Sequence, residues 1–272
     1  RMTEELFVSA PEFVLVQMAG WHTKVMPIAN EFAKELGGMR KTYAVAGLEG
    51  EPPYDDPFAW EQTSRLLQLV LVAMEFMGTY RLGAPGHETN YELTPLTSAN
   101  GIERFVAGMP RAYGRNRIKT ALSLALPHAA SPMETALALM LSLPPELGGF
   151  GLPKPKLNRP LPVDGHELLW SGGPSIKPDF LWPEAKLAIE YDSDECHGSA
   201  GSRKLARDAA RSNVLSTMGY NVLRVTTLNI QQPAEVERLA RQVAMQLGMM
   251  LAEPDDVLRI RRGKLHRLLM QQ

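Results

Sequence analysis

The stretch of the chain over residues 176–226 constrains the fold most, because charged side chains there interrupt segments that otherwise look buried. It contains two short apolar runs, at residues 177–182 and 187–192, and their length and the tight Pro-Glu-Ala turn between them favour strands. A helix is predicted over residues 202–218, followed by a third strand over residues 220–226, which are rich in β-branched side chains. The order strand, strand, helix, strand predicts an α/β (α+β) domain with a small mixed sheet flanked by helices.

Acidic residues occupy both of the first two predicted strands. Asp179 follows Pro178 at the start of the first strand, and Glu190 and Asp192 lie in the second strand after Ala188. Because alternate side chains of a strand point to the same face, Ala188, Glu190 and Asp192 share one face. Two like charges on one face repel, and the small alanine leaves room for a cation. The pattern therefore predicts a cation site, although a turn cap at Asp179 and a solvated face at Glu190 and Asp192 are simpler alternatives.

A helix is predicted directly upstream of these strands. Ser131 is suited to the N-cap, a proline occupies the first helical position, and the helix runs to about Leu143, where two prolines end it. Glu134 has two interpretations. It completes a capping box with Ser131, but it also shares a helical face with Leu137 and Ala138, which would point its carboxylate inward.

Six sequence features follow one another in a set order over residues 131–230. They are the helix glutamate Glu134, Pro178-Asp179-Phe180 at a strand start, the strand Ala188 to Asp192, His197, Arg207-Asp208 with Arg211 on a helix, and the strand Gly219 to Val225. This order and spacing resemble the very-short-patch-repair type of endonuclease and related bacterial endonuclease-domain proteins of the PD-(D/E)-x-K superfamily.

The resemblance implies a restriction-endonuclease-like fold and a metal-dependent DNA endonuclease or nickase that acts in repair or phage defence. The implied catalytic residues are Glu134, Asp179, Glu190, Asp192 and His197, with Mg²⁺ (or Mn²⁺) held by Asp179, Glu190 and Asp192. Glu134 would hold a metal-bound water. His197 would serve as a general acid or base, because the ordinary pKa of histidine lies near neutrality. Outside this pattern, His197 would be an ordinary surface histidine.

One position departs from the family pattern, because Asp192 stands where a lysine is expected two residues after Glu190. The cation that would replace this lysine stays open among Lys177, Lys186, Lys204, Arg207 and His197. The departure favours an alternative function, a non-catalytic DNA-binding regulator or antitoxin-like protein that retains a nuclease-like fold. A protein-interaction module with no nucleic-acid role is a third hypothesis.

DNA binding is predicted to rest on local basic patches, because the formal net charge of −1 gives no overall attraction to nucleic acid. Arg203, Arg207 and Arg211 follow one another at a spacing of four residues and form a stripe that predicts phosphate contacts. A solvated face paired with Asp208 is the alternative. The basic stretch at residues 259–267 would either bind nucleic acid or be a frayed terminus.

Composition divides the chain into three parts. Residues 1–128 are expected to form a mainly helical domain, with helix-compatible apolar spacing at residues 11–19, 25–36 and 58–77. Residues 129–252 would form the endonuclease-like domain, which ends in an amphipathic helix over residues 233–250, and residues 253–272 a basic tail. The amino-terminal part resembles the upstream region of endonuclease-domain proteins, some of which are similar to abortive-infection antitoxins, and this implies a protein partner for it.

The bulk composition favours a globular cytoplasmic protein, with 44% hydrophobic and 22% charged residues. The longest apolar run, residues 66–74, is too short to cross a bilayer, and we expect no membrane association and no signal peptide. The single cysteine, Cys196, excludes an intramolecular disulfide and fits a reducing compartment.

Overall fold

The computed structural model describes residues 10–20, 57–84, 87–109, 114–163, 165, 173–192 and 211–271. The chain divides into two units, which are described separately. The helical unit lies within residues 1–73 and 97–123, and the sheet unit within residues 74–96 and 124–272. Among the helices in the described ranges, none is both long and apolar enough to span a membrane.

Helices make up the helical unit, as the sequence predicts for this part of the chain. They are α1 (Pro11–Gly20), α3 (Pro57–Met77, whose last turn belongs to the sheet unit), α4 (Ala99–Ala107) and α5 (Arg115–Leu124). Thr97, which precedes α4, donates a hydrogen bond to the Glu12 carboxylate of α1. The Arg117 guanidinium of α5 donates to the Ala19 carbonyl of α1 at 2.8 Å. These bonds hold α4 and α5 to α1. The predicted helices at residues 11–19 and 58–77 are confirmed, and the one at residues 25–36 lies outside the described residues.

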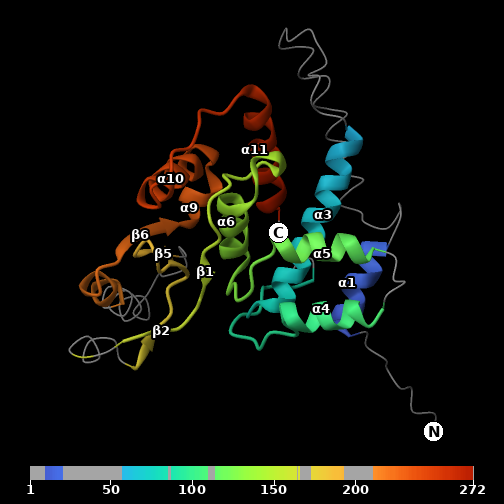
Figure 1. Cartoon of the computed structure of the whole chain (residues 1–272), viewed down its shortest axis with the longest axis horizontal. Helices are drawn as coiled ribbons and strands as arrows, with labels where there is room; N and C mark the ends of the chain where they lie inside the picture. The colour runs from blue at the N-terminus through green and yellow to red at the C-terminus, as the bar shows by residue number, and fades with distance from the viewer. Residues whose placement is uncertain are drawn as a thin grey trace. The chain divides into compact units, whose positions relative to one another are not determined.

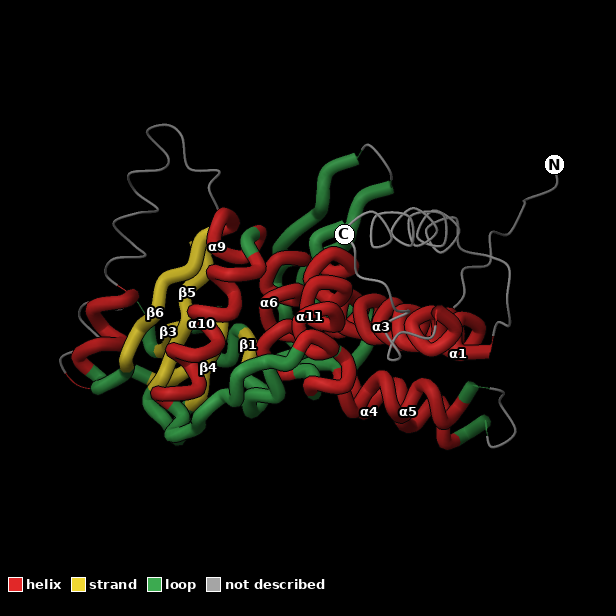
Figure 2. Tube along the Cα trace, turned by 90° about the horizontal axis from the view of Figure 1, so that it is seen from above, coloured by secondary structure: helices red, strands yellow, loops and turns green. Residues whose placement is uncertain are grey.

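A four-stranded mixed sheet forms the centre of the sheet unit (Figure 1). Its strands, in spatial order, are β1 (Lys156–Leu157), β4 (Phe180–Trp182), β5 (Leu187–Asp192) and β6 (Asn221–Thr226). β5 pairs antiparallel with β4 and parallel with β6, which confirms the predicted small mixed sheet. Two further short strands, β2 (Leu161–Pro162) and β3 (Ser175–Ile176), pair with each other. Figure 2 shows β5 and β6 running side by side.

The helical elements of the sheet unit are α6 (Pro132–Ser142), the short 3₁₀ helix η1 (Pro145–Leu147), α9 (Thr227–Gln231), α10 (Pro233–Gln246) and α11 (Asp256–Leu269). α9 begins where β6 ends, because the Thr226 side chain caps it by accepting from the Asn229 amide. α6, α9, α10 and α11 contact one another in a connected helical layer. Residues 211–217 are also helical and precede β6.

Local sequence signals account for the elements that carry the candidate site. The Ser131 hydroxyl accepts the Glu134 amide at 3.1 Å and starts α6, as expected for this N-cap. Between β4 and β5, Lys186 has a positive φ of 49° and donates its amide to the Pro183 carbonyl at 3.2 Å, so the turn is tight. β5 has the predicted bounds, whereas only Phe180 to Trp182 of the strand predicted over residues 177–182 pairs as a strand.

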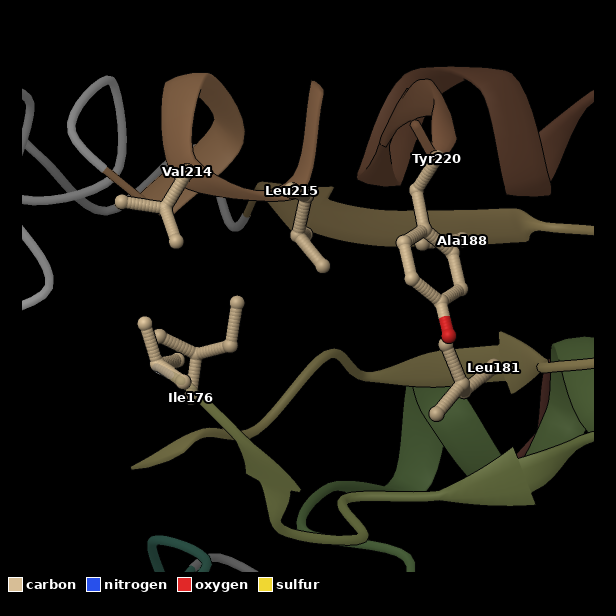
Figure 3. Packing of buried hydrophobic residues seen from close by; sticks show 7 residues of the cluster. Ile176, Leu181, Ala188, Val214, Leu215 and Tyr220 are labelled. Atoms are coloured by element: carbon tan, nitrogen blue, oxygen red, sulfur yellow. The ribbon is translucent and has the colours of Figure 1, made fainter. Parts of the chain in front are cut away.

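Apolar packing fixes the helical turns at residues 211–217 over one face of the sheet. Val214 and Leu215 from these turns belong to the same buried cluster as Leu181 of β4 and Ala188 of β5, and Figure 3 shows them pointing toward the strands. Gly219, with a φ of 81°, ends the helix in a left-handed conformation that suits glycine. Because Glu190 and Asp192 alternate in phase with Ala188, the carboxylates lie on this same face.

The structural division of the chain differs from the sequence-based one. Residues 74–96 belong to the sheet unit, where Tyr80 shares a buried 2.9 Å hydrogen bond with Thr135 of α6. The segment expected to be a basic tail, residues 253–272, contains α11. α11 contacts α6 and η1, and Arg262 lies over the Phe150 ring at 4.1 Å, so tertiary packing orders a stretch whose charge resembled a frayed terminus.

Leu215 is predicted to carry much of the packing between residues 211–217 and the sheet, since it is fully buried. Leu215→Ala should lower the free energy of unfolding by between about 2 and 5 kcal/mol, through lost burial and a cavity. Leu228→Ala in α9 is the matched control, because this side chain is 61% exposed and should change stability by less than about 0.5 kcal/mol. Urea denaturation measures both, and equal losses would contradict the packing described.

Candidate functional site

Glu134 lies buried at the start of α6, with 5% of its surface exposed. The carboxylate accepts hydrogen bonds from the Ser131 hydroxyl and the Ala130 amide, both at 3.0 Å, and from the Asn158 side chain at 2.6 Å. Both interpretations of this residue therefore hold in part. The helix cap binds it locally, and the side chain is directed into the protein.

Asn158 connects Glu134 to Asp179, which precedes β4. The side-chain amide of Asn158 donates to the Glu134 carboxylate, while its backbone amide donates to the backbone carbonyl of Asp179 at 3.2 Å. Asn158 follows β1 with a positive φ of 47°, a conformation that asparagine adopts more readily than most residues. The Asp179 carboxylate in turn accepts the Tyr191 amide of β5 at 2.7 Å. The asparagine and a backbone amide thus hold two carboxylates from different elements close together.

The electrostatics of Glu134 reflect this position. Burial raises the pKa of Glu134 from its ordinary value of 4.5 to about 7, and the nearby negative charge of Asp179 adds to the rise. Hydrogen bonds from Ala130, Asn158 and Ser131 act in the opposite direction. A carboxyl group with a pKa near neutrality can take up and release a proton at physiological pH.

Glu190 lies one step further across the sheet. The β4–β5 register pairs Phe180 with Ile189, so its continuation by one residue sets Asp179 opposite Glu190. Glu190 is 7% exposed, and its carboxylate forms an ion pair with Arg211 at 3.1 Å. The Arg211 guanidinium also donates to the Lys177 carbonyl. The buried charge of Glu190 is therefore compensated by an arginine from residues 211–217.

Asp192, at the end of β5, also faces an arginine. The Arg224 guanidinium of β6 lies 3.5 Å from the Asp192 carboxylate and donates to the Ser212 hydroxyl at 3.0 Å. In the parallel register Arg224 is the partner of Glu190, so its side chain lies on the same face as the two acids. The β5 acids and the two arginines therefore form two ion pairs on this face of the sheet.

The structure thus brings together some of the residues expected from the sequence. Glu134 and Asp179 are neighbours, whereas Glu190 and Asp192 each contact an arginine. Within the described part of the chain, no three acidic, histidine or cysteine side chains are grouped closely enough to hold a metal ion. His197, Arg203 and Arg207 lie outside the described residues, so their roles stay predictions.

Sequence reasoning missed Asn158 and Arg224. The signal for Arg224 was its register opposite Glu190, which follows only after β5 and β6 are paired in parallel. Among the lysines considered as substitutes for the motif lysine, Lys186 lies over the Tyr220 ring at 4.5 Å, at the end of β5 away from Asp192. Within the described residues, Arg211 is a cation that contacts Glu190.

Comparisons with known proteins give the chain relatives of undescribed activity. No protein-family model and no solved structure matches it. Two uncharacterized proteins, from two strains of Mycobacterium tuberculosis, are each 32% identical to the chain over 146 residues. The match covers 54% of this chain and 48% of each relative, so the chain spans about half the length of the curated relatives it matches.

The stability of the protein is predicted to decrease as the pH rises from about 4.5 to about 7, owing to Glu134. Its pKa is raised in the folded chain, so folding favours the protonated form. This contribution is complete below the unfolded-state pKa and is lost as the pH passes through the folded-state pKa. We expect it to amount to roughly 3 kcal/mol, measured by urea denaturation at stepped pH in a chelating buffer.

Glu134→Gln should remove this part of the pH dependence. The amide has the same shape, and it can accept from Ala130 and Asn158 while donating to the Ser131 hydroxyl. Glu146→Gln, at an exposed position of η1, is the matched control and should leave the pH dependence unchanged. A wild-type slope that persists in Glu134→Gln would show that another group titrates.

Proposed function

We propose that the protein is a metal-dependent DNA endonuclease or nickase with a restriction-endonuclease-like sheet unit. The observation that carries the proposal is the proximity of the Glu134 and Asp179 carboxylates, with Glu190 opposite Asp179 in the β4–β5 register. Three elements of the fold contribute these carboxylates, and one of them has a pKa near 7. A structural ion pair does not need two buried carboxylates near each other. Acid-base catalytic sites, by contrast, commonly bring such carboxylates together.

Hydrolysis of a phosphodiester requires a water to lose a proton and the phosphate charge to be neutralised. Asp179 is held in place by the Tyr191 amide, and Glu134 by three donors, so both carboxylates are fixed before substrate binds. In the proposal, Glu134 orients a water molecule and exchanges a proton with it near neutral pH. His197 is proposed to act as general acid or base.

Carboxylate oxygens are the ligands that Mg²⁺ prefers, and the donor set fits this ion in kind. Asp179 and Glu190 would hold the Mg²⁺ or Mn²⁺, with Asp192 as a further donor. Such an ion, when bound, activates water and neutralises charge on the phosphate. The ion pair between Arg211 and Glu190 would have to open, because the arginine occupies one face of this carboxylate.

A second function is favoured by these same ion pairs. Arg211 and Arg224 compensate Glu190 and Asp192, and a site of this kind is stable without a cation. A non-catalytic DNA-binding regulator, or an antitoxin-like protein with a nuclease-like fold, would retain such an arrangement. In either function, the helical unit is proposed to bind a protein partner.

Plasmid nicking in Mg²⁺ or Mn²⁺ tests the leading proposal. Asp179→Asn should reduce the cleavage rate by on the order of a hundredfold or more, because it removes a charge needed in the transition state. Asp256→Asn is the matched control, since this α11 aspartate is 92% exposed and should leave cleavage unchanged. Equal cleavage by the two variants, or DNA binding with no cleavage by the wild type, would favour the regulator.

A further inference from the structure

Arg211 and Arg224 reach the same face of β5 from different elements. Arg211 precedes the buried Val214 and Leu215 on the helical turns, and Arg224 lies at the centre of β6. Ser212, the neighbour of Arg211, accepts a hydrogen bond from Arg224 at 3.0 Å, which ties the two positions together. The two guanidinium groups therefore border one short stretch of surface next to Glu190 and Asp192.

The arginines are more accessible than the more buried of their partners. The side chains of Arg211 and Arg224 are 33% and 44% exposed, whereas that of Glu190 is 10% exposed. Each guanidinium presents several N–H donors in one plane, an arrangement that matches two oxygens of a phosphate. An incoming anion can thus approach the arginines from solvent, while Glu190 stays buried beneath Arg211 and Asp192 lies half-exposed beside Arg224.

We propose that Arg211 and Arg224 form a binding site for backbone phosphates of a nucleic acid, and that Glu190 and Asp192 compete with the phosphates for the two arginines. This deepens the proposed function and rests on it, because it supplies the substrate contact beside the acidic residues. In the absence of nucleic acid, the carboxylates of Glu190 and Asp192 occupy the two arginines. This competition keeps binding weak and accounts for a DNA-binding surface in a chain whose net charge is −1.

If the carboxylates compete with the phosphates, removing one carboxylate should tighten nucleic-acid binding when no metal is present. Binding of a fluorescein-labelled DNA duplex is measured by anisotropy in EDTA over a range of salt concentrations. Glu190→Gln and Asp192→Asn should tighten binding, by on the order of tenfold for Glu190, because one charge-assisted contact is released to the phosphate. Arg211→Gln and Arg224→Gln should weaken binding and lower the salt slope by about 1 each.

A second ion pair provides matched controls. Arg65 and Glu61 of α3 form an ion pair, and their side chains are 31% and 47% exposed. Glu61→Gln and Arg65→Gln change the total charge by the same amounts, but on the helical unit. If Asp192→Asn tightens binding no more than Glu61→Gln does, the proposal is overturned, since the effect would then be one of net charge alone.

Folding and the choice of nucleic acid are controlled separately. Glu190→Gln alters a buried position, so its thermal unfolding is recorded, and the half-exposed Asp192→Asn decides the result if Glu190→Gln unfolds. Single-stranded DNA and RNA of the same sequence are tested in parallel, because all three carry the same phosphodiester groups. Tighter binding of any of them by Asp192→Asn than by its control supports the site.

The binding and cleavage measurements distinguish the phosphate site from the nuclease activity. Because EDTA removes the divalent cation, the binding result does not depend on catalysis. The predicted binding pattern with no cleavage in Mg²⁺ or Mn²⁺ would refute the nuclease and support the phosphate site. Normal cleavage with no difference between the β5 variants and the α3 controls would refute the phosphate site only.

Discussion

The packing of residues 211–217 against β4 and β5 is the interaction on which the rest of the site depends. Ala188 is small and fully buried, which allows Leu215 to approach the sheet closely. Once this contact forms, strand alternation leaves Glu190 and Asp192 on the face of β5 that these helical turns cover in part. Arg211, at the start of these turns, then lies within ion-pair distance of Glu190. The ion pair between Arg211 and Glu190 is thus a consequence of the apolar packing of Leu215 and Ala188.

Burial affects the two carboxylates Glu134 and Glu190 differently. Burial raises the pKa of Glu134 to about 7 and the nearby Asp179 carboxylate adds to the rise, while its neutral hydrogen-bond donors oppose the rise only in part. Glu190 is almost as buried but faces a guanidinium, which compensates its charge directly. A chain with one protonatable carboxyl and one ion-paired carboxyl at the end of the same sheet has groups suited to both proton transfer and charge compensation.

Much of the fold follows from local sequence signals, whereas the partners within the site do not. The bounds of β5, the cap of α6 and the end of the helix at Gly219 were predictable, because each depends on neighbouring residues. The contacts of Asn158 and Arg224 depend on residues brought near by strand pairing. α11 was missed for a related reason, since the burial of its apolar and arginine side chains is decided by α6 and η1 rather than by its own charge.

Locating a bound divalent cation would decide whether the acids at this end of the sheet form a catalytic metal site. A crystal of the protein soaked in Mn²⁺ and measured at the manganese absorption edge would locate the ion by its anomalous signal. If they do, we expect a peak within bonding distance of Asp179 and Glu190, with the Arg211 side chain displaced from Glu190. Full retention of the Arg211–Glu190 pair, with no peak near either acid, would contradict the proposed metal site.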